Sequence, residues 1–205
     1  MTFIRNETAR DLHPDDMRRM GVGKRFWHVS VDQIPETAHY RKELDRYLQN
    51  LEENVRSGVG MMFYGDYRKG KTSSAVILAK AVVAYGGTSY FIRSDDLVSS
   101  VLEKKEFDQD QTVMQRLDTV DLLVVDDLGA EHTGKSHFNV ALLEKIVRYR
   151  YDNRKALVLT VNLSPKNLVE VYGEGTLKVI KSMMRVVEVD GTNWYEQEVS
   201  SIKPR

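Results

Sequence analysis

The sequence lacks cysteine, long apolar runs and a dominant sign of charge. Without cysteine, disulfide bridges and cysteine-based zinc sites are excluded, and a reducing compartment fits. No apolar run is long enough to span a bilayer, and the polar first twenty residues lack the apolar core of a signal peptide. Since 30 basic residues balance 30 acidic ones, any contact with nucleic acid must use a local surface. We therefore expect a soluble cytoplasmic protein with no membrane partner.

Apolar strands alternate with helices from residue 61 onward. Strands are predicted at 61–65, 88–93, 121–129, 155–162 and 185–191. Helices are predicted at 39–57, 71–86, 96–105, before residue 119, at 139–154, and near 165–172 and 175–184. The strands are nearly continuous in apolar residues, as in a parallel sheet covered on both faces. The sequence thus predicts an α/β fold, preceded by a polar and irregular arm at 1–36.

The segment GDYRKGKTSS, at 65–74, fits the phosphate-binding pattern G-x-x-x-x-G-K-[ST]. It follows a predicted strand and opens a predicted helix, so its backbone N–H groups and the helix N-terminus are placed to hold phosphate. Lys71 is expected to reach the β- and γ-phosphates, and Thr72 to offer its hydroxyl to Mg²⁺. The expected nucleotide-binding residues are Gly65, Tyr67, Arg68, Lys69, Gly70, Lys71, Thr72 and Ser73. The charges of Arg68 and Lys69 either assist binding or point to solvent.

A second polar element follows the strand LLVVDDLG. Asp126 is the expected carboxylate of the Mg²⁺ shell, and Asp127 is placed to polarise the attacking water. Glu131 lies close behind, with either a catalytic role or a solvated one. The next strand ends in LTVN, where Thr160 and Asn162 would lie between the acids and the phosphate loop. Asn162 is therefore expected to orient water near the γ-phosphate.

Together these motifs resemble the AAA+ ATPases of the DnaC/DnaI/IstB group, which are helicase loaders and transposition helper ATPases. The resemblance rests on the phosphate loop, LLVVDDLGAE, IVRYRYDNRKALVLTVNLSP and RVVEVDG. It implies a three-layer αβα fold with a parallel sheet of order 5-1-4-3-2. It also implies ATP or ADP with Mg²⁺ in the site, Asn162 as the sensor and Asp127 as the catalytic acid. The implied partners are single-stranded DNA, a replicative helicase and further copies of the chain in an ATP-dependent homo-oligomer.

The sequence departs from this group at several places. Many relatives have a glycine where Arg68 stands. Met183 occupies the place of an arginine that reaches the neighbouring subunit's γ-phosphate. Lys178, Lys181 and Arg185 are the possible trans-acting replacements, or they form a solvated helix end; lysine lacks the bidentate fork of arginine. We expect no C-terminal helical lid, and the arm at 1–36 is too short for a helicase-binding domain.

Two local signals remain open. Basic and aromatic residues alternate at 148–155, a composition that can hold single-stranded DNA by charge and stacking. Tyrosines at helical spacing can equally pack in the core, and arginines can cap a helix end. The second signal is KRFWHVSVDQI, at 24–34. The resemblance implies that Trp27 or His28 borders the nucleotide base; alternatively, Trp27 anchors the arm to the core.

We divide the chain into an N-terminal arm (1–36), an AAA+ core (37–195) and a C-terminal tail (196–205). The leading hypothesis is an ATPase that acts as a DnaC-like helicase loader on single-stranded DNA, with Lys71, Asp127 and Asn162 as its catalytic residues. The open alternatives are an IstB-like transposition helper and a nucleotide-binding adaptor with little hydrolysis. A small-molecule phosphotransferase is disfavoured, because the sequence shows no arginine-rich lid.

Overall fold

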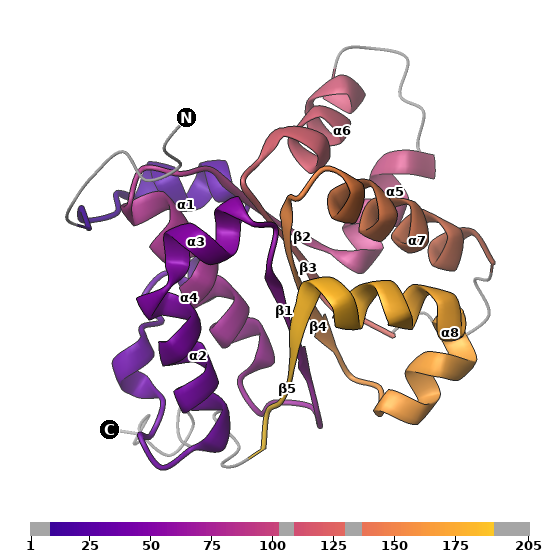
Figure 1. Cartoon of the computed structure of the whole chain (residues 1–205). Helices are drawn as coiled ribbons and strands as arrows, with labels where there is room; N and C mark the ends of the chain where they lie inside the picture. Colours follow the sequence, from indigo (N-terminus) through magenta and orange to yellow (C-terminus); the bar gives the residue numbers. More distant parts are fainter. Residues whose placement is uncertain (1–8, 103–108, 130–136, 191–205) are drawn as a thin grey trace, which may run out of the picture.

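A five-stranded parallel sheet forms the centre of the molecule. The computed structural model describes residues 9–102, 109–129 and 137–190. The strands are β1 (Gly60–Tyr64), β2 (Ser89–Arg93), β3 (Leu122–Leu128), β4 (Ala156–Val161) and β5 (Met184–Glu188). Their order is β2-β3-β4-β1-β5, which is the predicted order read from the other edge. The predicted fold class and strand order are therefore confirmed (Figure 1).

Helices cover both faces of the sheet (Figure 1). They are α1 (Pro14–Met20), α2 (His39–Gln49), α3 (Leu51–Arg56), α4 (Lys71–Ala84), α5 (Ser94–Leu102), α6 (Gln109–Thr119), α7 (His137–Asp152) and α8 (Pro165–Met183), with 3-10 turns η1 (Lys24–Phe26) and η2 (Val31–Gln33). One hydrophobic core joins α1–α4 to one face, and a second joins α5–α8 to the other. In the described part of the chain, none of the helices combines the length and apolarity that a bilayer crossing requires.

The central strands β1, β3 and β4 are mostly apolar because they have a core on both sides. In β1, Met61 and Phe63 pack into the first core, and Met62 between them packs into the second. Because all five strands are parallel, their carboxyl ends share one edge of the sheet. The segments that follow β1, β3 and β4 therefore meet at this edge, where the sequence places its polar motifs.

Residues 9–36 differ from the irregular structure that was predicted for the arm at 1–36. They contain α1 and both 3-10 turns, and the side chains of Met17, Met20 and Ile34 are buried in the first core. Their apolar residues follow no regular period, because the segment changes direction repeatedly as it packs over α4. The position of the domain boundary at residue 36 stays a prediction.

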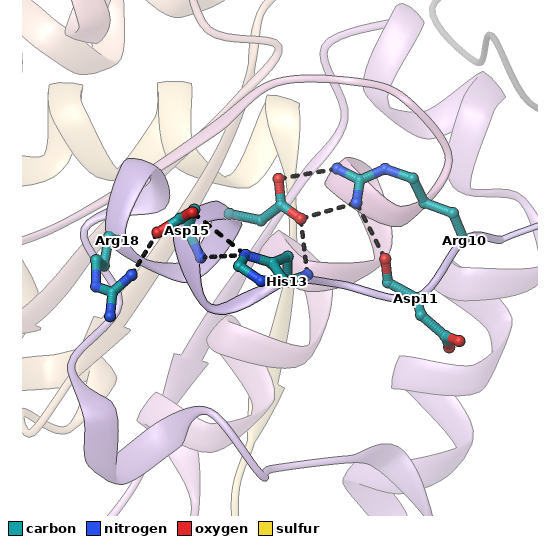
Figure 2. A network of polar contacts seen from close by, with 6 residues as sticks. Arg10, Asp11, His13, Asp15 and Arg18 are labelled. Carbon is teal, nitrogen blue, oxygen red and sulfur yellow. Dashed lines mark hydrogen bonds and ion pairs between the residues drawn. The ribbon is translucent and has the colours of Figure 1, made fainter.

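An ion-pair network fixes the start of this segment (Figure 2). Arg10 donates two hydrogen bonds to the buried carboxylate of Asp16, at 2.7 and 3.0 Å. The same carboxylate accepts a bond from the backbone N–H of His13 and so caps α1. Arg10 also donates its backbone N–H to the carbonyl of Ala84, at the end of α4. The network thus ties residues 10–16 to the helix that starts at the phosphate loop.

Arg150 corrects one expectation from the sequence. It was grouped with the cations at 148–155 as a possible contact for DNA, yet its side chain is fully buried. Its guanidinium donates to the carbonyls of Leu117, Val120 and Ala156, at 2.7, 2.9 and 2.8 Å. Arg150 therefore joins the end of α6 to the start of β4. Tyr149 and Tyr151 are partly exposed rather than packed in the core.

Candidate functional site

The loop between β1 and α4 adopts backbone angles that depend on its glycines. Gly65 has a φ of 139°, and a Cβ there would lie 2.6 Å from the carbonyl oxygen of Val189. Gly70, directly before α4, has a φ of 102°. Both angles are readily reached only by glycine. The loop therefore turns tightly into the N-terminus of α4, where free backbone N–H groups and the helix dipole favour an anion.

Lys71 is the first residue of α4 and is buried. Its ammonium donates to the carbonyl oxygens of Gly65 and Asp66, at 2.8 and 2.6 Å. Burial lowers the pKa of Lys71 to about 8, although the nearby charges of Asp127, Asp126 and Asp66 act in the opposite direction. An incoming phosphate would supply the negative charge that this ammonium needs.

Thr72 and Asp126 meet beside the loop. The Asp126 carboxylate is buried and accepts a bond from the Thr160 hydroxyl at 2.6 Å. Burial raises the pKa of Asp126, and hydrogen bonds from the hydroxyls of Thr160 and Thr72 oppose that rise. A hydroxyl next to a carboxylate fits Mg²⁺, which takes few protein ligands and completes its shell with phosphate oxygens and water. Among the described residues, no cluster of three or more His, Asp or Glu side chains suited to a metal occurs.

Asp127 lies at the end of β3 with its carboxylate between two partners. The Asn162 amide donates to one of its oxygens. Arg93, at the end of β2, donates to the other at 3.4 Å. The backbone N–H of Asp127 donates to the Thr160 hydroxyl at 2.8 Å. Thr160 thus bonds to both neighbouring aspartates and fixes the position of each.

These residues line one large cavity of about 1070 Å³. Six of the eight predicted nucleotide-binding residues line it, namely Tyr67, Arg68, Gly70, Lys71, Thr72 and Ser73. Asp126, Asp127, Thr160 and Asn162 line it as well. Gly65 and Lys69 do not appear among the lining residues; Gly65 acts through the loop's conformation.

Another wall of the cavity comes from residues 21–34. Phe26, His28, Val29 and Ile34 lie in this wall, together with the polar side chain of Gln33. Trp27 is turned away, and its ring N–H donates to the carbonyl of Val22 at 2.8 Å. The structure thus separates the two residues that sequence reasoning kept together, since His28 lines the cavity and Trp27 anchors the segment.

The possible trans-acting residues lie away from this cavity. Lys178 and Lys181 are exposed near the end of α8, and Arg185 follows at the start of β5. These residues thus lie at the edge of the sheet where the strands begin. The phosphate loop lies at the other edge, where β1 ends. Met183 is buried in the second core. Glu131 lies outside the described residues.

Sequence reasoning missed Arg93 and most of the wall at 21–34. Arg93 had one available signal, since it ends the strand that neighbours β3 and is in register with Asp126. For the wall, the resemblance gave one signal, which placed Trp27 or His28 of KRFWHVSVDQI beside the nucleotide base. Its other residues match no motif and are brought to the cavity by contacts distant in sequence.

Comparison with known proteins agrees with this geometry. The model of the IstB-like ATP binding protein family matches residues 9–190. A curated relative from Sinorhizobium fredii, described provisionally as an insertion sequence ATP-binding protein, is 27% identical over 108 residues. That match covers 53% of this chain and 35% of the relative, so this chain spans only about a third of the relative's length.

Two solved structures share the fold. The crystal structure of the DnaC helicase loader is 25% identical, with a TM-score of 0.72, and the match covers 82% of this chain and 100% of that one. The crystal structure of DnaI is 18% identical, with a TM-score of 0.70 and coverage of 84% and 93%. With the family model matching most of its length, the chain belongs to the IstB-like ATP-binding proteins and has the P-loop AAA+ fold of the DnaC and DnaI structures.

Proposed function

We propose that the chain binds ATP with Mg²⁺ in the cavity and hydrolyses it to ADP and phosphate. The observation that carries this proposal is the meeting of three groups at the start of α4. The Lys71 ammonium, the Thr72 hydroxyl and the Asp126 carboxylate all lie beside the glycine-containing loop between β1 and α4. A triphosphate with its metal ion is the ligand whose charges and oxygen atoms match all three.

Each side chain then has a role in the reaction. Lys71 contacts the β- and γ-phosphates, and Thr72 and Asp126 hold Mg²⁺, which would neutralise charge on the phosphate oxygens. Asp127 accepts a proton from the water that attacks the γ-phosphorus, and ADP leaves with the electron pair of the broken bond. Asn162, bonded to Asp127, orients that water. Arg93 donates to the other oxygen of this carboxylate, so the attacking water shares the acceptor with Arg93 or displaces it.

We further propose that the chain works as an ATP-dependent homo-oligomer. Lys178, Lys181 and Arg185 lie at the edge of the sheet opposite to their own phosphate loop. They can therefore reach a phosphate only in a neighbouring copy. A trans-acting cation stabilises the charge of the transition state and is worth about 10³-fold or more when it is an arginine.

Our preferred role is that of a helicase loader on single-stranded DNA. It is supported by the match to the DnaC helicase loader, which covers that whole chain and 82% of this one. Residues 148–155 retain Arg148, Arg154 and the partly exposed Tyr149 and Tyr151 as candidates for DNA contact. The partner would be a replicative helicase.

A second role, that of a transposition helper, is supported by different observations. The family that matches this chain is that of the IstB-like ATP binding proteins. The name of the curated relative links it to an insertion sequence. This relative matches little more than half of the chain, which is why we place the role second.

Phosphate release with Mg·ATP, measured with and without single-stranded DNA, tests the shared activity. Turnover that rises with single-stranded DNA supports the proposal, and absence of turnover under both conditions leaves an adaptor that only binds nucleotide. To separate the two roles, the chain is added to the replicative helicase of the same organism on a protein-coated single strand. Helicase transfer to the strand supports the loader, and failure of transfer favours the transposition helper.

A further inference from the structure

Two cations inside the fold hold the wall of the cavity at 27–34, although neither cation lines the cavity itself. Lys80, in α4, donates to the carbonyl oxygens of Trp27 and Val29, at 3.0 and 2.6 Å. Arg41, in α2, donates to the carbonyl oxygens of Val31 and Ile34, at 2.6 and 2.7 Å. Within eight residues, four backbone carbonyls are therefore fixed by two side chains.

The wall that they fix has the mixed surface which an aromatic base requires. Val29 and Ile34 give it apolar side chains, Ser30 and Gln33 give it polar ones, and the apolar Phe26 lies directly before it. Ligand pockets pair predominantly apolar walls with a few polar groups that set orientation. The phosphate loop and the aspartates lie at another part of the same cavity, so a nucleotide held there by its phosphates has this wall available for its base.

Lys80 links the two ends through a single rigid element. It lies nine residues after Lys71 on α4, which is about 14 Å along the helix axis. The N-terminus of α4 forms the phosphate site, and Lys80 holds the wall. A shift of this helix relative to the wall would therefore change the space between phosphate and base.

We propose that Lys80 and Arg41 are positioning residues which hold the wall at 27–34 in place for the base of the bound nucleotide. This inference rests on the proposed function, because it assumes that the cavity binds ATP. Neither side chain touches the ligand; each acts through the backbone that it binds. Arg41 is itself held by Asp45, at 2.8 Å, so its guanidinium is fixed on both sides.

The test compares two ligands, Mg·ATP and magnesium tripolyphosphate, because the second has the phosphates without the base. Calorimetric titration of Lys80→Met should show ATP affinity reduced about tenfold or more, since each lost bond has a charged donor. Tripolyphosphate affinity should stay within about twofold of the wild-type value, because the phosphate loop is untouched. Lys80→Arg, which keeps a cationic donor, should restore most of the ATP affinity, and Arg41→Leu should repeat the pattern of Lys80→Met.

Two further variants separate positioning from loss of stability. Lys42→Met changes an exposed lysine on α2 and should leave both affinities unchanged. Val147→Ala opens the second core, on the other face of the sheet, and provides a matched loss of melting temperature. If Val147→Ala weakens ATP binding as much as Lys80→Met does, the effect is one of stability and the inference is wrong.

The remaining outcomes distinguish a failure of the positioning role from a failure of the proposed function. An unchanged ATP affinity in Lys80→Met, or an equal loss for ATP and tripolyphosphate, overturns the positioning role and leaves the proposed function standing. A wild-type chain that binds neither ligand overturns the proposed function and, with it, this inference. The fluorescence of Trp27, read in a Trp194→Phe background, should change in Lys80→Met, because the wall's backbone is released.

Discussion

Two parts of the cavity are built in different ways: the phosphate end, which contains the phosphate loop and the aspartates, and the wall at 21–34. At the phosphate end, the side chains lie in the last residues of buried strands or in the segments that follow them, and Lys71, Asp126 and Thr160 are themselves buried. The wall is a chain of short turns whose backbone is held by Lys80 and Arg41 from two helices. The phosphate end depends on the sheet, whereas the wall depends on a few charged hydrogen bonds.

This difference decides what each end contributes to binding. A site fixed by a parallel sheet is rigid and keeps its geometry without a ligand, which suits the transfer of a phosphoryl group. A wall held by side chains from elsewhere in the fold can change with a single substitution. We therefore expect variants at the phosphate end to affect the reaction, and variants of the wall to affect the choice and affinity of the nucleotide.

The largest effect is expected for Asp127→Asn, at the phosphate end. Removing a general base typically costs about 10²–10⁴-fold in rate, and the amide keeps the size of the side chain. Phosphate release should fall by that factor, whereas ATP affinity, measured by calorimetry, should change little. Undiminished turnover would show that another group activates the water.

A smaller effect at the same end is expected for Thr160→Val, which keeps the shape but removes the hydroxyl. That hydroxyl bonds to the Asp126 carboxylate and to the Asp127 backbone. Outer partners of metal ligands typically contribute about 10–100-fold to affinity or activity. The Mg²⁺ concentration for half-maximal turnover should therefore rise. If the Mg²⁺ dependence is unchanged, Asp126 does not need this support.

At the wall, Phe26→Ala should weaken ATP binding about tenfold, because an aromatic contact to the base is lost. Tripolyphosphate binding should not change. Exposed Tyr151 on α7 provides a control, since Tyr151→Ala removes an aromatic side chain far from the wall. Equal losses for both ligands would mean that Phe26 supports the phosphate end, and the distinction between the two ends would fail.

The smallest effect is expected at the ion pair of Arg10 and Asp16, which anchors the segment that continues into the wall. The hydrogen bond from Arg10 is the main cause that lowers the pKa of Asp16 from 3.8 to about 2. A carboxylate with a lowered pKa stabilises the fold above its ordinary pKa, and this contribution is lost as the pH falls from about 4 through 2.

Asp16→Asn should therefore reduce the free energy of unfolding by about 1 kcal/mol at pH 7, a value discounted because Arg10 is partly exposed. The difference from wild type should narrow as the pH falls from about 4 through 2 in urea titrations. A difference that stays constant over this range would show that the charge of Asp16 does not matter.

The sequence predicted the sheet and the phosphate end because both are encoded locally. The strand order came from the resemblance, and the alternation of apolar strands with helices supported it. The loop and the DDLG element each carry their chemistry within a few residues, and parallel strands bring such segments to one edge.

Two features could not be predicted from the sequence: the bonds that hold the wall and the burial of Arg150. Lys80 and its acceptor carbonyls are more than fifty positions apart, and no local pattern marks such a pair. In the sequence, Arg150 belongs to a group of cations that either contact DNA or cap a helix end. It is buried because the carbonyls at the end of α6 and at β4 supply the hydrogen bonds that its guanidinium requires.

The most direct test of the central claim is a calorimetric titration of Mg·ATP into the wild-type chain and into Lys71→Ala. Lys71 lies at the start of α4, where its ammonium donates to the Gly65 carbonyl of the loop, and we propose that it contacts phosphate. Saturable binding to the wild type and a loss of about 100-fold or more in the variant would agree with the account, given how strong charge-assisted bonds to phosphate are. Equal affinity in the two proteins would place the nucleotide elsewhere and contradict it.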